Sequence, residues 1–400
     1  MSLVGTAPDA QVSTFPGRLA IQQRVLPAYR AGFLEALAKA CDSGLSVLAG
    51  KPTPQEGILP AERLQSVQYT PIENRTIFPV TSPLHQCWQP GLLEWLESSD
   101  PDVLIVDANP RLASNPQAVR WMHARGRPVL AWGLGAPLYR ARSSLGQLLV
   151  PFREERRRRM LRSYDGWIAY SRRGAAEYRA LGLPSERVFV APNAVAFRPI
   201  NPEPDRPARS VERPVVLFVG RLQARKRIDN LLWACAALPA AKQPELWIVG
   251  DGPARSDFEA LAVESYPKAR FFGAKRGAEL ETLFKAADLF VLPGTGGLAA
   301  QQAMSYALPL VVAQGDGTQE DILPTEETSQ EGRVVQAQNG WRIAPEDPQA
   351  LQQALQEALS DPARLQKMGS ESFRLIKEEI NVESMVAAFL FAVRRLLGGV

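Results

Sequence analysis

The feature that most constrains this chain is a repeated alternation of short apolar runs with helical segments. In the first half, the apolar runs that predict strands lie at 18–25, 45–49, 102–106, 128–132 and 166–170. The helical patterns between them lie at 29–41, 92–97 and 115–125. The runs are apolar throughout rather than at every second residue, which is typical of strands buried on both faces of a sheet. Strands and helices in alternation predict a parallel, doubly wound α/β sheet.

The pattern stops at residues 201–214 and then restarts. This stretch, NPEPDRPARSVERP, holds four prolines and has the composition of a linker. The strands predicted after it lie at 215–219, 246–249, 270–272, 289–292 and 310–313, and the last three helices at 347–359, 361–380 and 384–397. Because 400 residues suit two domains, we expect a flexible tail (1–17), an N-terminal Rossmann-like domain (18–200) and a C-terminal one (215–380). We expect the final helical segment, 381–400, to cross back to the N-terminal domain.

Charge and cysteine content narrow the class of protein. Residues 1–205 carry 24 basic and 18 acidic side chains, and residues 206–400 carry 22 and 24. This asymmetry indicates either an anionic partner for the first half or ordinary surface variation. Cys41, Cys87 and Cys235 lack metal-ligand spacing, so we expect no metal site and a reduced, cytoplasmic protein. No signal-peptide pattern and no apolar run of about 20 residues is seen.

One candidate site follows the first strand of the second half, in VVLFVGRLQARKRID (215–229). Gly220 ends the strand and permits a close approach of backbone to ligand. Arg221 and Lys226 follow, and ligands of doubly wound sheets bind outside the carboxyl ends of strands. Two cations at such an end suit a diphosphate, because arginine binds it with two donors and lysine adds a point charge. The alternative is a solvated basic turn.

A second candidate site is the glycine-rich turn in LFVLPGTGGLAAQQAMSYA (289–307). Gly294, Thr295, Gly296, Gly297 and Leu298 lead from a strand into a helix. Free backbone N–H groups and the helix dipole at such a point favour an anion. The alternative is a tight turn that merely needs glycine. Neither a G-x-G-x-x-G fingerprint nor a Walker motif occurs, which disfavours dinucleotide oxidoreductases and P-loop NTPases.

The ordered segments VGRLQARKRID, LWIVGDGP, RFFG, LFKAADLFVLPG, QQAMSYALPLVV and NGWRIAPED resemble the C-terminal domain of retaining glycosyltransferase family four. In the first half, IQQRVLPAYRAGFLEALA, VLAWGLGAP, DGWIAYSRRGAAEY and VAPNAV resemble one subgroup of that family. The resemblance implies a GT-B fold, in which two Rossmann-like α/β domains face each other across a cleft. It also implies a transferase that uses a UDP- or GDP-linked sugar as co-substrate, with a glycan, lipid-linked or small-molecule acceptor and no cofactor, metal or nucleic acid.

The resemblance also assigns residues. Arg221 and Lys226 are the expected catalytic groups, which stabilise the leaving diphosphate. The expected donor-binding residues are Gly220, Gly250, Gly294, Thr295, Gly296, Gly297, Leu298 and Gln302. The residues expected on the acceptor side of the cleft are Tyr29, Arg30, Trp132, Gly133, Gly135 and Asn193.

The chain departs from the family pattern at three positions. Gly294 and Gln302 stand where the family usually has glutamates, and Leu134 stands where the subgroup often has histidine. His85 and His123 match no family position. Two classes of function therefore stay open: an active retaining glycosyltransferase, or a non-catalytic GT-B protein that binds a sugar nucleotide or partners another transferase. A sugar phosphorylase is disfavoured because no lysine resembles a cofactor-binding one.

A last motif is FREERRRRMLRSY (152–164), which holds six arginines between Arg153 and Arg162. It predicts a basic helix that faces either anionic lipid or solvent. A peripheral membrane contact through this segment is one expectation, and a solvated, partly ion-paired face is the other.

Overall fold

The computed structural model describes residues 14–53, 56, 58–79, 82, 85–137, 147–148, 150–205, 214–325 and 333–398. Two compact units divide the chain: residues up to 195 together with those from 382 onward, and residues 196–381. We call them unit 1 and unit 2. The expected tail up to residue 13 and most of the expected linker, 206–213, lie outside the described residues.

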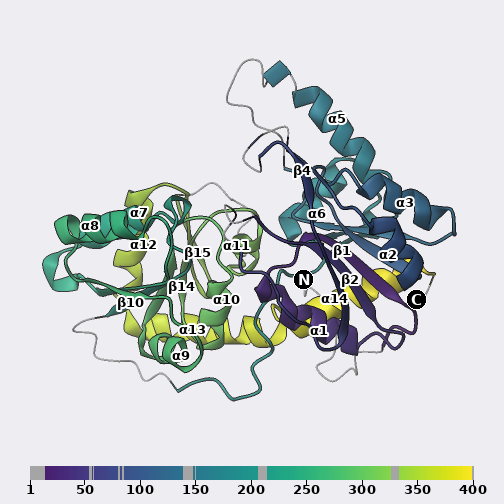
Figure 1. Cartoon of the computed structure of the whole chain (residues 1–400). Helices are drawn as coiled ribbons and strands as arrows, with labels where there is room; N and C mark the ends of the chain where they lie inside the picture. The colour runs from purple at the N-terminus through teal and green to yellow at the C-terminus, as the bar shows by residue number, and fades with distance from the viewer. Residues whose placement is uncertain are drawn as a thin grey trace. The chain divides into compact units, whose positions relative to one another are not determined.

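Unit 1 is built on a seven-stranded parallel sheet (Figure 1). Its strands are β1 (Leu19–Val25), β2 (Leu45–Gly50), β3 (Val67–Ile72), β6 (Val103–Asp107), β7 (Val129–Gly133), β8 (Gly166–Ala169) and β9 (Val188–Val190). They lie in the order β3-β2-β1-β6-β7-β8-β9, and every neighbouring pair is parallel. A separate antiparallel ribbon joins β4 (Arg75–Ile77) to β5 (Gln86–Trp88).

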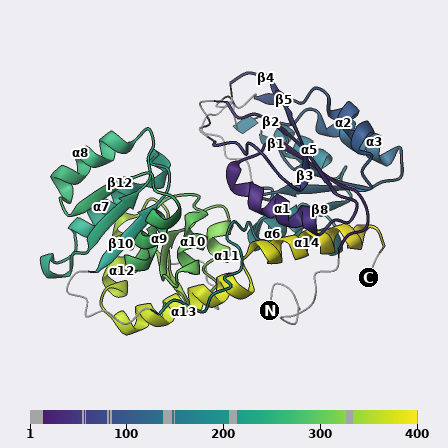
Figure 2. The same ribbon diagram turned by 60° about the horizontal axis from the view of Figure 1, so that its bottom comes forward.

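The helices of unit 1 include the end of the chain. They are α1 (Ala31–Lys39), α2 (Leu92–Ser99), α3 (Asn115–His123), α5 (Val150–Leu161), α6 (Arg172–Ala180) and α14 (Val382–Leu396). Helix α14 packs beside α1 (Figure 2). Its Phe389 ring lies edge-on to Phe33 at 4.8 Å and to Trp132 at 4.9 Å between centroids. These rings are buried, so the final helix completes the hydrophobic core on this face of the sheet.

Unit 2 repeats the architecture. Its strands are β10 (Val215–Val219), β11 (Glu245–Val249), β12 (Ala269–Gly273), β13 (Leu289–Leu292), β14 (Leu310–Ala313), β15 (Val334–Ala337) and β16 (Gly340–Ile343). Their order is β12-β11-β10-β13-β14-β16-β15, and all neighbours are parallel except β15 and β16. The helices are α7 (Ile228–Ala236), α8 (Arg255–Ser265), α9 (Gly277–Ala286), α10 (Ala299–Ser305), α11 (Thr318–Asp321), α12 (Pro348–Ala358) and α13 (Pro362–Glu378).

The prediction of two Rossmann-like, doubly wound α/β domains is confirmed. Besides the ribbon strands β4 and β5, the apolar pattern missed four strands at or next to an edge of the two main sheets. Strand β3 is mostly exposed and contains Pro71, and β9 has only three residues, so neither has the apolar run of a central strand. The remaining two, β15 and β16, form an antiparallel hairpin, which lies outside a strictly alternating βα pattern.

Strand order fixes where each sheet can bind a ligand. In unit 1 the chain moves from β1 outward to β3 and then crosses to β6 on the other side of β1. In unit 2 it moves from β10 to β12 and then crosses to β13. Doubly wound sheets bind ligands outside the carboxyl ends of the strands at such a switch point. Within the described ranges, every helix is too short or too polar to span a bilayer.

Candidate functional site

The switch point of unit 2 is formed by the segments that leave β10 and β13. Gly220 directly follows β10, and its N–H donates to the carbonyl of Val249 at 2.9 Å. Gly250, with φ of +136°, packs against it so closely that a Cβ there would lie 1.9 Å from the Gly220 oxygen. Only glycine can occupy position 250, because any side chain would collide with the backbone of Gly220. Both predicted glycines therefore set the shape of the strand ends.

Lys226 connects this segment to the glycine-rich turn. It ends a short 3₁₀ helix, η4 (Ala224–Lys226), and is only 5% exposed. Its Nζ donates to the carbonyl oxygens of Thr295 at 2.9 Å and Gly296 at 2.7 Å. The fold thus brings together two sequence-predicted elements that lie about 70 residues apart in the chain.

The environment of Lys226 weakens its hold on the proton. Burial, together with the nearby charge of Arg225, lowers the pKa of Lys226 to about 8, and Asp316 opposes the shift. An ammonium in such a place is short of negative charge, because its described hydrogen-bond acceptors are neutral carbonyls. An anionic ligand at this point would restore the charged form.

Two exposed arginines lie in the same segment as the lysine. Arg221 is exposed directly after Gly220. Arg225 is also exposed, and its Nη1 donates to the carbonyl of Thr295 at 3.3 Å. The sequence reasoning did not select Arg225, although the run Arg225-Lys226-Arg227 was a visible signal. Arg227 turns elsewhere and pairs with Asp229 at 3.0 Å.

The turn from Gly294 to Leu298 packs tightly on η4. A Cβ on Gly294 would lie 2.2 Å from the oxygen of Arg225 and 2.6 Å from the carbonyl carbon of Lys226. Thr295 N–H already donates to that Arg225 oxygen at 3.2 Å. Gly296 and Gly297 have φ of +70° and +149°. The glycines are therefore needed for the turn itself, and the Thr295 amide is not free for an anion as the sequence reasoning supposed.

Helix α10, which follows, is short and carries Gln302 on its surface. Leu298 is its N-cap residue, and the helix has seven residues. Gln302 is exposed, whereas its neighbour Gln301 is buried. From the next strand, β14, the segment after Ala313 brings Asp316 near Lys226. Sequence reasoning missed Asp316, because only the pairing of β14 beside β13 places it there.

The switch point of unit 1 carries the predicted Tyr29 and Arg30. Both lie in the 3₁₀ turn η1 (Ala28–Arg30) after β1. Arg30 is 5% exposed, and its guanidinium carbon lies 4.6 Å from the ring centre of Trp132 and 5.1 Å from that of Tyr170. Such packing stabilises the cation through the ring faces. Tyr29, in contrast, is about half exposed.

Strand β6 adds an acid to this switch point that sequence reasoning missed. Burial raises the pKa of Asp107 to about 6, and the positive charges of Arg24 and Arg30 oppose that shift. The carbonyl of Asp107 accepts a hydrogen bond from Asn115 Nδ2 at 2.8 Å. The acid stands at the end of a predicted strand, which was the available signal.

The other predicted residues of unit 1 follow β7 and β9. A Cβ on Gly133 would meet Ala108 Cβ at 2.8 Å. One on Gly135, with φ of +122°, would meet Gly174 Cα at 2.6 Å. Both glycines therefore serve close packing of this loop. Asn193 is half-buried after β9, and Leu134 is exposed at 46%.

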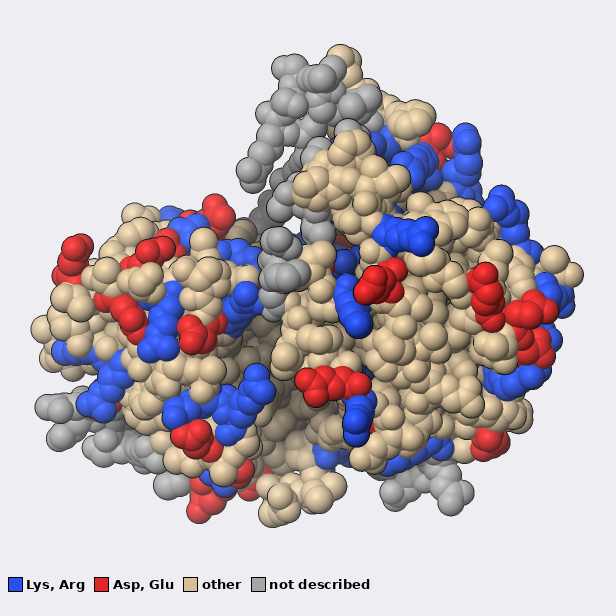
Figure 3. Space-filling view, in the orientation of Figure 1, with Lys and Arg blue, Asp and Glu red and all other residues tan. Residues whose placement is uncertain are grey.

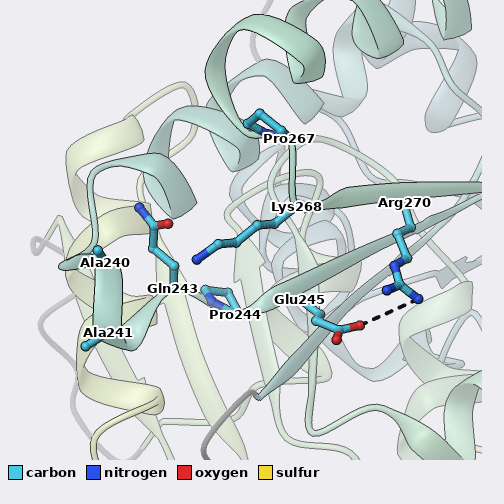
Figure 4. A pocket seen from close by; sticks show the side chains of 8 residues that line it. All are labelled: Ala240, Ala241, Gln243, Pro244, Glu245, Pro267, Lys268 and Arg270. Atoms are coloured by element: carbon cyan, nitrogen blue, oxygen red, sulfur yellow. Dashed lines mark ion pairs between the residues drawn. The ribbon is translucent and has the colours of Figure 1, made fainter.

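A cavity of about 500 Å³ lies elsewhere on unit 2 (Figure 4). It is lined by Ala240, Ala241, Gln243, Pro244, Glu245, Pro267, Lys268 and Arg270. Glu245 begins β11 and Arg270 lies near the start of β12, so the cavity is at the amino ends of the strands. It is at the opposite edge of the sheet from the switch point.

The remaining candidate ligands have structural surroundings. All three cysteines are buried and free of disulfides. His85 Nδ1 lies 2.8 Å from the carbonyl of Phe78, and His123 Nε2 lies 2.9 Å from Asp165. In the part of the chain that the structure describes, no group of three or more His, Cys, Asp or Glu side chains is arranged to hold a metal.

Comparison with known families now identifies the class of protein. Residues 200–374 match the glycosyl transferases group 1 family, and residues 28–194 match the glycosyl transferase 4-like domain. Together these matches cover most of the chain, one in each half. The chain belongs to the family-four type of glycosyltransferases and has their GT-B fold.

Individual relatives match only part of this chain. The sulfoquinovosyl transferase SQD2 of Arabidopsis thaliana is 35% identical over 124 residues, which is 30% of this chain and 23% of that protein. The D-inositol 3-phosphate glycosyltransferase of Kineococcus radiotolerans is 30% identical over 215 residues, 48% of each chain. The matched segments thus span a quarter to a half of these relatives. The Anabaena protein HepE, solved in complex with UDP, has a TM-score of 0.66 at 17% identity and covers 94% of this chain and 99% of its own.

Proposed function

We propose that this protein transfers a sugar from a nucleotide-diphosphate sugar to an acceptor hydroxyl with retention of configuration. The acceptor class is a glycan, a lipid-linked sugar or a small molecule, and the donor is UDP- or GDP-linked. The observation that carries the proposal is the buried ammonium of Lys226, held at the switch point of unit 2 with two exposed arginines in the same segment. Relatives with a solved structure include one that binds UDP.

The proposed chemistry asks the protein mainly to stabilise negative charge. The bond between the anomeric carbon and the β-phosphate oxygen breaks, and its electron pair stays on the diphosphate. The acceptor oxygen bonds to the anomeric carbon from the same face, and its proton passes to the departing phosphate. Arg221 and Lys226, with Arg225 beside them, would stabilise that phosphate. No metal is needed in this proposal, since cationic side chains take its role.

The chain lacks one of the carboxylates that the family resemblance implies for holding the transferred sugar. The tight contact of Gly294 with the backbone of Arg225 leaves no room for the carboxylate that the family resemblance implies there. We therefore expect poor discrimination between related hexoses. The residues after β1, β7 and β9, namely Tyr29, Arg30, Trp132 and Asn193, stay our proposal for the acceptor side. The peripheral membrane contact expected from the sequence is likewise a proposal.

A non-catalytic protein that binds sugar nucleotides is the second candidate. It is favoured by the packing of Gly294 and by the exposed amide of Gln302 in place of a carboxylate. Such a protein would retain the cationic segment for binding and turn over no donor.

Slow hydrolysis separates the two candidates. Charge stabilisation acts on the leaving diphosphate whatever the nucleophile is, so an active enzyme without acceptor should release nucleoside diphosphate slowly. The protein would be incubated with a panel of UDP- and GDP-sugars, with the Arg221→Ala/Lys226→Ala variant as control. Release that needs these two residues and yields the α-sugar supports the enzyme. Tight binding without turnover with any acceptor supports the second candidate, and absence of binding contradicts both.

A further inference from the structure

The outward face of the β4–β5 ribbon carries large apolar side chains. Ile77 lies opposite Gln86, and Arg75 lies opposite Trp88. Directly opposed residues of an antiparallel pair share a face, and side chains alternate between the two faces. Cys87 points the other way and is fully buried. Ile77 and Trp88 therefore face outward, and they are 63% and 37% exposed.

Helix α5 presents a matching stripe. Phe152 is 71% exposed, and Leu148, just before the helix, is 77% exposed. Phe152, Arg156 and Arg159 follow at intervals of four and three residues, which places them on one side of the helix. Arg156 and Arg159 are exposed. One side of α5 thus runs from apolar to basic.

A hydrogen bond joins the ribbon to the helix. Arg156 Nη2 donates to Gln86 Oε1 at 3.1 Å. Helix α5 and strand β4 lie close together at one end of unit 1 (Figure 1). This contact sets the two groups of side chains next to each other where Arg156 meets Gln86, and we call them together the basic-apolar surface. Its members are Arg75, Ile77, Phe78, Trp88, Leu148, Phe152, Arg156, Arg159 and Arg162.

The charge of this surface is strongly positive. The segment 150–162 has six arginines and two glutamates. Glu154 pairs with the buried Arg157, and Glu155 pairs with Arg158 at 3.2 Å. Among the described residues no ion pair involves Arg156, Arg159 or Arg162. The space-filling view shows Lys and Arg side chains gathered over the position of α5 (Figure 3).

A solvated basic helix does not account for this composition. Five large apolar side chains are exposed on the same surface as the arginines, and clustered apolar exposure marks an interaction site. Cations beside aromatic and aliphatic side chains are the combination that lies in the interface of an anionic bilayer. Ile77 and Leu148 are aliphatic, so stacking on the bases of a nucleic acid would leave them unused.

We propose that the basic-apolar surface docks the protein on an anionic membrane. Ile77, Phe78 and Phe152 enter the headgroup layer, and Arg156 and Arg159 contact lipid phosphates. The ribbon adjoins the end of β1, because Asn74 Nδ2 donates to the carbonyl of Arg24 at 2.8 Å and Gln89 Nε2 donates to that of Gln23 at 2.9 Å. None of the residues of the basic-apolar surface belongs to the proposed donor site, so the inference does not rest on the transferase proposal.

Vesicle flotation tests the docking with the full chain. We expect binding to phosphatidylcholine vesicles that contain about one third phosphatidylglycerol, and release at high salt. Each arginine near such a surface contributes about fivefold in partitioning. Arg156→Gln/Arg159→Gln should therefore weaken partitioning about 30-fold. Ile77→Ser/Phe152→Ser should weaken it about tenfold or more, because apolar burial contributes independently of charge.

Matched controls test whether the position of the substituted residues matters, rather than only the loss of charge or of apolar side chains. Arg276→Gln/Arg395→Gln removes the same charge from exposed positions outside the surface. Ile200→Ser/Val263→Ser removes apolar side chains that are 96% and 75% exposed. Both controls should bind vesicles like the parent chain, and circular dichroism would verify folding.

Three results would overturn the inference. The first is absence of binding to the anionic vesicles at low salt. The second is equal binding to pure phosphatidylcholine, which removes the role of charge. The third is binding that falls with the arginine variant but not with the Ile77/Phe152 variant, which would indicate electrostatic adsorption without entry of the apolar side chains into the bilayer.

Discussion

Replacement of Lys226 by alanine tests the proposed donor site directly. The ammonium is already buried, so it meets an incoming phosphate without first losing much water. A charge-assisted hydrogen bond contributes about 1.5–3 kcal/mol. We therefore expect Lys226→Ala to weaken binding of UDP or GDP by about 10- to 150-fold. Isothermal calorimetry at pH 7 would measure it.

The pH dependence of binding identifies the responsible group. With a pKa of about 8, Lys226 is mostly charged at pH 7 and mostly neutral at pH 9. A bound diphosphate stabilises the charged form and raises that pKa, so binding takes up a proton above pH 8. Affinity should accordingly be about twofold weaker at pH 8 than at pH 7, and about tenfold weaker at pH 9 than at pH 7. The terminal phosphate of the nucleotide ionises at about pH 6 and therefore contributes little between pH 7 and pH 9.

A matched lysine provides the control. Lys268 is exposed and lines the cavity at the opposite edge of the same sheet. Lys268→Ala should leave both the affinity and its pH profile unchanged. If Lys226→Ala kept the parent affinity, or kept the weakening between pH 7 and 9, the proposed role of Lys226 would be refuted. Loss of binding in Lys268→Ala would instead place the nucleotide in the cavity.

Three further predictions concern the same switch point. Gln302→Glu should preserve or improve nucleotide binding measured by calorimetry. The position is exposed, so a carboxylate fits there, and its oxygens can accept hydrogen bonds from the ribose as proposed for Gln302. A large loss of binding would show that this side chain does not contact the ribose. Gly294→Ala should lower the free energy of unfolding by about 1–3 kcal/mol in denaturant titration, because its Cβ would lie 2.2 Å from the Arg225 oxygen, and unchanged stability would contradict this packing. Arg225→Ala should weaken binding of the nucleoside diphosphate less than Lys226→Ala does, because its guanidinium is exposed, and the reverse order would contradict this ranking.

The fold was predictable where one segment carries the whole signal. Central strands such as β10 and β13 are buried on both faces, so their sequences are apolar throughout. Such a strand can be predicted from its own residues, without knowledge of the strands that pair with it. Strands β3 and β9 lie at the sheet margins or are too short, and their assignment depends on the neighbour that pairs with them.

The candidate site also has features that the sequence predicts and contacts that only the tertiary structure shows. Sequence alone placed a glycine and two cations after one strand and a glycine-rich turn after another, because local residue types determine where a strand ends and which charges follow it. It could not show that Lys226 donates to the carbonyls of Thr295 and Gly296, or that Asp316 approaches from a third strand. Those contacts join residues far apart in the chain, so only the crossover that sets β13 beside β10 brings them together. Burial of Lys226 and its lowered pKa arise from that same packing, which no local pattern encodes.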